Sequence, residues 1–157
     1  MVKPKKKLQR EINDFAKRYN TYTFEPHVTL VGLMYKPKNE VVTRGGEIAK
    51  KLKPYTIKLQ DLFYIDAYYG CLMIKAKPTP MVMQANKIAQ ELFVLEEDYT
   101  PHLSLIYGNL EANEKKKIIS EVGTKLQLEF IVDKLSVYYT GGYVKDWHMI
   151  EEYNFSK

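Results

Sequence analysis

The sequence predicts an α+β fold, and three observations lead to that prediction. Segments with helical spacing of apolar residues alternate with segments in which every second residue is apolar. A short pattern (aromatic, any residue, Pro, His, aliphatic, Thr/Ser, Leu, aliphatic) occurs twice, at 24–31 and at 99–106. The elements around both copies also follow the same order. We therefore expect a bilobal, duplicated fold with two antiparallel sheets, helices on the outside and a central cleft.

The first half reads as helix, motif strand, helix, strand, strand. Apolar residues recur at helical intervals over 8–19, and more weakly over 41–52, where Gly45 and Gly46 disfavour the start of a helix. Alternation over 55–60 and over 72–76 predicts two strands joined by a turn near Gly70. Pro26 suits the first residue of the motif strand because it has no N–H to donate.

The second half repeats this order. Helical spacing over 81–93 precedes the second motif strand, and a further helix over 118–122 has Asn113 as its expected N-cap. Alternation predicts strands over 126–132 and 135–139, followed by a last segment over 147–155. We expect one domain over 1–157, built from pseudo-repeats at about 5–77 and 81–155.

Composition narrows the class of protein. The 157 residues suffice for one core, and no apolar run reaches the length of a membrane span. The single cysteine, Cys71, excludes an internal disulfide and fits a reducing, cytoplasmic setting.

The net charge of +5 equals the charge of a basic N-terminal cluster, and the rest of the chain is balanced. We expect a monomer whose basic cluster is a solvated tail leading into a helix, not a nucleic-acid anchor. That cluster consists of Lys3, Lys5, Lys6, Lys7 and Arg10.

The two motifs carry the chemistry. On a strand, His27 and Thr29 point to one face, as do His102 and Ser104. Two imidazoles can supply a base and an acid near neutral pH, and two hydroxyls can donate to the oxygens of a small anion. The alternative is a duplicated scaffold that has kept its fold without the chemistry. The third histidine, His148, has no partner motif and is expected to be structural.

Three segments, "FEPHVTLVG", "YYGCLMIKAK" and "YTPHLSLIYGNL", resemble the 2H phosphoesterase superfamily, and within it the plant and fungal 2',3'-cyclic nucleotide phosphodiesterases. The resemblance implies that His27, Thr29, His102 and Ser104 line a cleft between two lobes, with His102 as base and His27 as acid. It also implies that Tyr107 lies near the bound phosphate or base. Strict alternation puts Tyr107 on the opposite face unless the strand bends before Gly108.

This chain departs from the family at its start. Relatives begin with a strand, whereas only four residues precede the first predicted helix here. We expect the first lobe to lack a strand or to borrow one from the C-terminal segment.

The leading hypothesis is metal-independent hydrolysis of a small cyclic phosphodiester without a cofactor. The substrate would be a nucleoside 2',3'-cyclic phosphate or ADP-ribose 1'',2''-cyclic phosphate. No carboxylates stand at metal-ligand spacing from the histidines. One alternative is a 2',5'-phosphodiesterase or RNA-end-processing enzyme that uses the N-terminal lysines and 36–38. Another is a non-catalytic nucleotide-binding module, although simple binding does not need two titratable groups.

Overall fold

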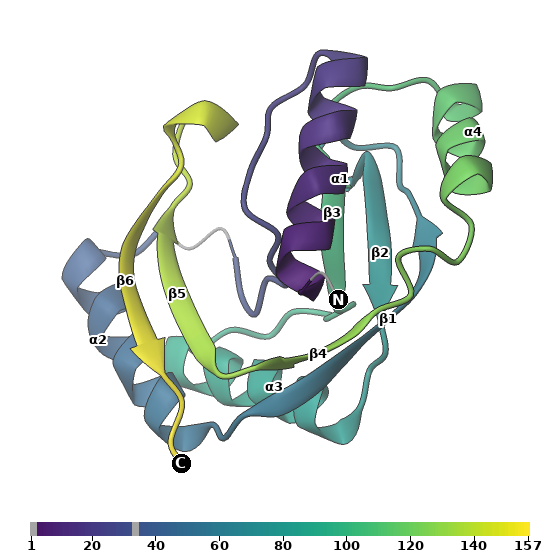
Figure 1. Cartoon of the computed structure of the whole chain (residues 1–157). Coiled ribbons are helices and arrows are strands. Elements are labelled where there is room, and N and C mark those ends of the chain that lie inside the picture. Colours follow the sequence, from purple (N-terminus) through teal and green to yellow (C-terminus); the bar gives the residue numbers. More distant parts are fainter. Residues whose placement is uncertain (1–2, 33–34) are drawn as a thin grey trace. The chain divides into compact units, whose positions relative to one another are not determined.

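The computed structural model describes residues 3–32 and 35–157. The helices and strands appear in Figure 1. The helices are α1 (Pro4–Tyr19), α2 (Lys38–Lys51), α3 (Pro80–Phe93) and α4 (Ala112–Val122). The strands are β1 (Tyr55–Phe63), β2 (Leu72–Ala76), β3 (His102–Ile106), β4 (Glu129–Val132), β5 (Lys134–Tyr139) and β6 (His148–Asn154). The α+β class is confirmed.

The chain forms two compact units, and each is assembled from three separate stretches of sequence. One, which we call the motif unit, comprises Met1–Thr29, Lys58–Lys77 and Thr100–Phe130. The second unit comprises Leu30–Ile57, Pro78–Tyr99 and Ile131–Lys157. The units therefore do not follow the halves of the sequence repeat. Both His-x-Thr/Ser motifs belong to the motif unit.

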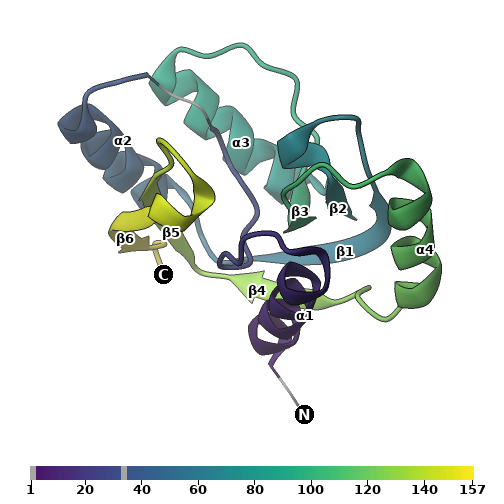
Figure 2. The ribbon, with the colours of Figure 1, turned by 90° about the horizontal axis from the view of Figure 1, so that it is seen from above.

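The motif unit is built on a sheet with strand order β3-β2-β1-β4. The first residues of β1 and the last residues of β4 belong to the second unit. Both β1–β2 and β2–β3 pair antiparallel. Helix α1 packs along β3 and buries one apolar stripe, Leu8, Ile12 and Phe15 (Figure 1). Pro4 stands at the first position of α1, where its missing N–H costs nothing. Figure 2 shows α1 and α4 beside the strands of this unit.

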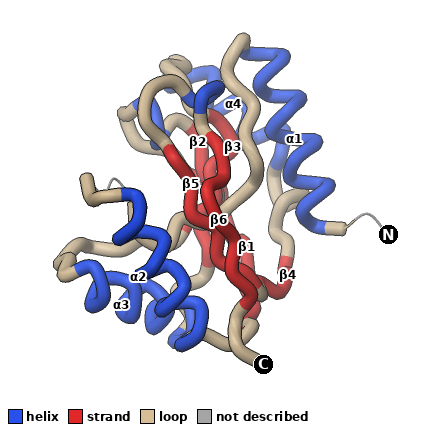
Figure 3. The backbone as a smooth tube through the Cα atoms, turned by 90° about the vertical axis from the view of Figure 1, so that its left-hand side faces the viewer, coloured by secondary structure: helices blue, strands red, loops and turns tan. Residues whose placement is uncertain are grey.

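The second unit packs helices α2 and α3 together, and α2 also contacts both strands of the β5–β6 hairpin (Figure 3). Its core is apolar and continuous. Thr79 caps α3 through the N–H of Val82, and Pro80 again occupies the first position. The buried members of the core are Ile48, Ala49, Leu52, Ala85, Ala89, Phe93 and Phe155.

Several element predictions were wrong in detail. The first motif is not a strand; within 20–30 the structure has only an isolated bridge at Val28. Helix α4 begins earlier than expected, since Glu111 rather than Asn113 is its N-cap and forms a capping box with Glu114. The predicted strand over 126–132 is shorter, starting at Glu129. The basic N-terminal cluster is mostly the first turns of α1 rather than a tail.

Among the described residues, no helix combines the length and the hydropathy that a membrane span requires. The prediction of a single domain with two pseudo-repeats stays a prediction.

Candidate active site

The two motifs meet edge to edge within the motif unit. Val28 pairs antiparallel with Leu103 of β3. In such a pair, the flanking positions also face each other, so His27 lies opposite Ser104 and Thr29 lies opposite His102. All four side chains then point away from the Val28–Leu103 side. The bridge therefore brings the two motif segments side by side, and from its register we infer that the four residues predicted from the sequence share one face.

Helix α1 holds the first motif in place where a strand ladder does not. The Gln9 side chain donates from Nε2 to the carbonyl of Phe24 at 3.0 Å. Asn13 and Thr23 are joined by a side-chain hydrogen bond. Lys5 forms a 3.3 Å ion pair with Glu25, two residues before His27. The extended segment that carries His27 is therefore anchored by side chains of a helix rather than by backbone pairing.

Each motif histidine is oriented by its own backbone. Nδ1 of His27 lies 2.7 Å from the carbonyl oxygen of Glu25, and Nδ1 of His102 lies 2.8 Å from that of Thr100. A carbonyl can only accept, so Nδ1 carries the hydrogen in both neutral rings. This assigns Nε2 as the free nitrogen of each imidazole. His148 makes the same contact with Asp146, at 3.0 Å, so the contact is a local feature of histidine in this setting and does not mark a site by itself.

The two imidazoles interact electrostatically. Desolvation by surrounding protein atoms lowers the pKa of His27, although the residue keeps an exposed surface. The hydrogen bond to the Glu25 carbonyl opposes this lowering of the pKa, and a positive charge on His102 adds to it. In the free protein, His27 therefore holds its proton less readily than an ordinary histidine does.

A β-bulge brings Tyr107 to the same face as the motif side chains. Met73 pairs with Ser104, but Leu72 pairs with Ile106, so β3 has one extra residue at this point. The extra residue shifts the alternation by one, and Tyr107, just beyond β3, falls on the side of Ser104. The two side chains are hydrogen-bonded to each other. The structure supplies the bend that the sequence interpretation required.

Neighbouring rings hold the Tyr107 side chain. Its ring stacks on Phe24 with centroids 4.2 Å apart and an interplanar angle of 21°. Tyr69 meets it edge-on at 5.3 Å. Only 5% of Tyr107 is exposed, and burial raises the pKa of its hydroxyl. Because one ring face is covered by Phe24, Tyr107 has little free surface on which a base could stack.

A second bulge places Phe63 beside His102. Leu59 pairs with Ala76, but Leu62 pairs with Ile74, so β1 also carries an extra residue. Phe63 therefore faces the same way as its partner Met73, and its ring meets the His102 ring edge-on at 6.2 Å and 89°. The sequence interpretation missed Phe63, since unbroken alternation would put it on the opposite face.

Two further features of the described residues bear on ligands. Tyr107 also lines a cavity of about 660 Å³, whose other walls include Tyr22, Tyr68 and Asn109. That volume lies within the usual range for small-molecule sites. The described part of the chain contains no cluster of three or more His, Cys, Asp or Glu side chains that could hold a metal ion.

Comparison with known proteins gives a consistent result. The family model described as "Cyclic phosphodiesterase-like protein" matches residues 2–155. A cyclic phosphodiesterase of Arabidopsis thaliana is 30% identical over 95 residues, which cover 59% of this chain and 52% of that protein. The match thus spans about half the length of the plant enzyme. A putative phosphoesterase of Bacillus licheniformis is 27% identical over 148 residues, or 87% of this chain and 85% of that protein.

Solved structures share the fold. E. coli LigT complexed with 3'-AMP has a TM-score of 0.63 and 12% identity, covering 97% of this chain and 93% of LigT. A protein described as a phosphoesterase has a TM-score of 0.61 and 13% identity, covering 100% of this chain and 95% of its own. At these identities the likeness establishes the fold alone.

Proposed function

Because the chain belongs to the cyclic phosphodiesterase-like family, we propose that it hydrolyses a small cyclic phosphodiester by paired histidine catalysis. The observation that supports the proposal is the Val28–Leu103 bridge, which pairs the two segments that carry the His-x-Thr/Ser motifs. The proposed substrates are a nucleoside 2',3'-cyclic phosphate or ADP-ribose 1'',2''-cyclic phosphate.

The proposed reaction opens the ring with one proton taken and one given. Nε2 of His102 accepts a proton from water as the water oxygen attacks phosphorus. Nε2–H of His27 donates a proton to the ribose oxygen as its bond to phosphorus breaks. The product is a phosphate monoester, and a second proton exchange with solvent returns both rings to their starting states. A metal ion is not needed for either proton transfer.

The lowered pKa of His27 is compatible with its role as the acid. A phosphodiester anion beside the ring favours the protonated form, so substrate binding offsets the desolvation that lowers the pKa in the free protein. An imidazolium with a lowered pKa is also the stronger acid toward a leaving oxygen. We therefore propose that His27 is protonated when substrate binds.

The hydroxyl groups bind the phosphate in this proposal. Thr29 and Ser104 donate to non-bridging oxygens, on which negative charge grows in the transition state. Tyr107 can donate to Oγ of Ser104, which leaves the Ser104 hydrogen free for the phosphate. We assign Tyr107 a positioning role through Ser104, because its buried ring leaves little surface for direct contact with a base.

A second candidate is processing of an RNA end or of a 2',5'-phosphodiester. It is favoured by charge, since the motif unit holds 14 of the 24 Lys and Arg residues but only 9 of the 19 Asp and Glu residues. The solved complexes of LigT with 3'-AMP, NADP+ and ATP show that a protein of this fold binds nucleotides. A longer substrate would need further contacts beyond the motif face.

The test is a substrate panel followed by ³¹P NMR, with EDTA present throughout. The panel contains 2',3'-cyclic nucleotides, ADP-ribose 1'',2''-cyclic phosphate and 2',5'-oligoadenylate. We expect ring opening of a cyclic phosphate in the presence of EDTA. Activity that EDTA abolishes and a divalent ion restores would refute the mechanism.

Variants identify the residues involved. His27→Ala and His102→Ala each remove a proton-transfer group, and each should lower kcat by about 10²–10⁴-fold. The double variant should be little worse than either single variant, because both groups act in one transition state. His148→Ala is the matched control and should retain activity. Full activity of both single variants would leave only nucleotide binding as the function.

A further inference from the structure

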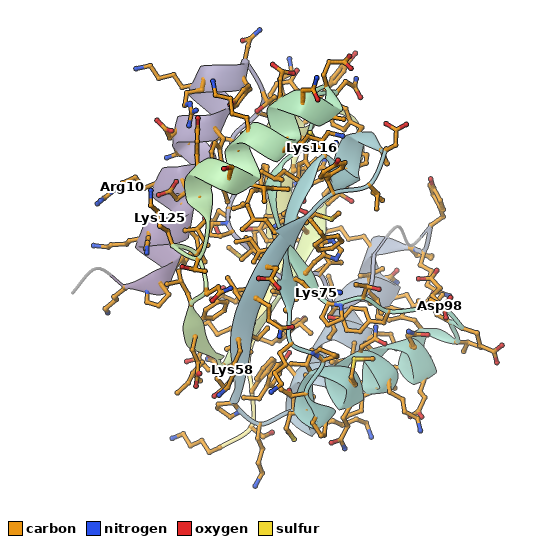
Figure 4. All side chains as sticks on the ribbon, turned by 90° about the vertical axis from the view of Figure 1, so that its right-hand side faces the viewer. Arg10, Lys58, Lys75, Asp98, Lys116 and Lys125 are labelled. Atoms are coloured by element: carbon orange, nitrogen blue, oxygen red, sulfur yellow. The ribbon has the colours of Figure 1, made fainter. Side chains whose placement is uncertain are left out.

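Lys75 is a cation on the motif face that the proposed reaction does not use. It lies on β2 directly opposite His102 of β3 in the antiparallel register. Opposed residues of neighbouring strands point to the same side of the sheet, so the Lys75 and His102 side chains share a face. Lys75 is exposed. Figure 4 labels Lys75 on the sheet, apart from Lys116 on helix α4.

One aromatic ring, that of Phe63, contacts both this ammonium and the histidine. Nζ of Lys75 is 5.9 Å from the centroid of the Phe63 ring, and the same ring meets His102 edge-on at 6.2 Å. Across residues 3–32 and 35–157, no carboxylate lies within ion-pair distance of Lys75, whereas Lys58 on the adjacent strand pairs with Glu129 at 3.0 Å. A cation–π contact at an exposed site is weak, so the charge of Lys75 remains available to an anion.

The strand order determines which anion Lys75 can reach. The first motif, β3 and β2 lie side by side in that order, since Val28 pairs with Leu103 and His102 pairs with Lys75. Neighbouring strands are about 4.8 Å apart, so Lys75 stands about 10 Å from the segment that bears His27. A phosphorus atom between His27 and His102 is therefore on the far side of His102 from Lys75.

We propose that Lys75 binds a second anionic group of the substrate, a terminal phosphate or a diphosphate one strand beyond the reacting phosphodiester. The inference rests on the proposed function, and it narrows the substrate to cyclic phosphates that carry a further phosphate. Lys75 is then a specificity residue: it contributes to the binding of one end of the substrate and takes no part in proton transfer.

The experiment compares two substrates that differ only at the second anion. These are adenosine 2',3'-cyclic phosphate with a free 5'-hydroxyl and the same compound with a 5'-phosphate. The wild-type protein should have the higher kcat/KM on the 5'-phosphorylated compound. Lys75→Gln should lower kcat/KM on that compound by about 10-fold, mainly through KM, and change it less than twofold on the 5'-hydroxyl compound. Lys75→Arg should retain most of the preference.

A matched control separates a local effect from overall charge. Lys116 is exposed on α4, and Lys116→Gln removes the same charge away from the motif face. This variant should leave the ratio of the two kcat/KM values unchanged. Equal losses on both substrates in Lys75→Gln, or no preference in the wild type, would overturn the proposal.

The proposal can also fail separately from the proposed function. If neither cyclic phosphate is hydrolysed, calorimetry with adenosine 3',5'-bisphosphate and adenosine 3'-monophosphate still tests Lys75. The bisphosphate should bind more tightly, and Lys75→Gln should remove most of the difference. Equal affinity of the wild-type protein for both ligands would overturn the role of Lys75, whatever the outcome of the kinetic test.

Discussion

The side chains of His27 and His102 make the same local hydrogen bond but lie in different surroundings. In each, a carbonyl two residues earlier fixes the hydrogen on Nδ1 and leaves Nε2 free. Their environments differ, since His102 belongs to strand β3 and His27 to an extended segment that is hydrogen-bonded to α1. Two similar groups in different environments can titrate differently, as a base and an acid require.

His27 should titrate below the ordinary histidine pKa of 6.5 in the free protein. Desolvation is the largest cause of the lowering and the charge on His102 a smaller one. NMR titration of the His27 ring should therefore give a midpoint below 6.5, and the midpoint should rise only partly in His102→Gln. One limb of the bell-shaped pH profile of kcat/KM should report this lowered pKa of His27.

The same shift affects stability in a defined direction. Because the pKa of His27 is lower in the folded protein than in the unfolded chain, the stabilising contribution of neutral His27 is complete above pH 6.5 and is lost as the pH falls through the folded pKa.

Added inorganic phosphate should raise the midpoint of the His27 NMR titration. A midpoint at or above 6.5 without phosphate would contradict the environment described for this ring.

Tyr107→Phe should separate the hydroxyl of Tyr107 from its ring. The variant keeps the ring stacked on Phe24 and removes the hydrogen bond to Ser104. We expect kcat to fall by about 3- to 10-fold with little change in KM, since one net hydrogen bond contributes about 1 kcal/mol. Steady-state kinetics on the best cyclic substrate provide the measurement. Tyr143→Phe, at an exposed tyrosine of the second unit, should change neither parameter.

A double variant tests how Tyr107 acts. If it works through Ser104, Tyr107→Phe should add little to the loss already caused by Ser104→Ala. Additive losses would indicate that Tyr107 contacts the substrate independently.

At the scale of elements, the two bulges decide what surrounds the motifs. Without the extra residue in β3, Tyr107 would face away from Ser104, and without the one in β1, Phe63 would face away from His102. The pairing of His with Thr or Ser could be predicted from alternation because it spans only two positions. The orientations of Tyr107 and Phe63 could not be predicted in this way. A bulge depends on the register with another strand, and the local pattern of residues does not indicate it.

The structure of the first motif also could not be predicted from alternation alone. Alternation predicts a strand over 24–31, yet the structure has only the bridge at Val28. The interactions that hold the segment come from Gln9, Asn13 and Lys5 of α1, which are polar residues on a helix and are invisible to a pattern of apolar spacing. The side chains of His27 and Thr29 still share a face, because extended backbone alternates whether or not it is paired.

Gln9→Ala should therefore weaken the site from a distance. The substitution removes the hydrogen bond to the Phe24 carbonyl, three residues before His27, and should lower the free energy of unfolding by about 0.5–1.5 kcal/mol. We also expect kcat/KM to fall a few-fold as His27 loses an anchor. Gln127→Ala, which removes a bond to the exposed Asp61 carboxylate, is the control. Urea denaturation of both variants measures the loss of stability, and steady-state kinetics measure the loss of kcat/KM. Equal activity of the two variants would show that the hydrogen bond from Gln9 does not matter for catalysis.

At the scale of the whole molecule, the sequence repeat and the spatial organisation divide the chain differently. The repeat places one motif in each half, whereas both motifs belong to one compact unit. The order of helices α1 to α4 was predictable because each has its own apolar stripe. The interleaving of three stretches into each unit was not, because it depends on contacts between segments far apart in the sequence.

The division of charge between the units leads to a last prediction. The motif unit carries the whole net charge of +5, and the second unit has 10 basic and 10 acidic residues. A cationic unit around the histidines should attract anionic substrates, and salt screens such attraction over about 10 Å at 0.1 M. We expect kcat/KM to fall by about 2- to 5-fold between 20 and 200 mM NaCl.

Two triple variants locate the source of this salt effect. Changing Lys3, Lys6 and Arg10 of the α1 region to Gln removes three exposed charges from the motif unit. Changing Lys50, Lys51 and Lys53 to Gln removes three exposed charges from the second unit. The first triple should lower kcat/KM at 20 mM NaCl and flatten its salt dependence, while kcat stays the same, because steering affects encounter rather than chemistry. The second triple should change the salt dependence less. The same flattening in both would mean that overall charge, and not its concentration around the two histidines, draws the substrate in.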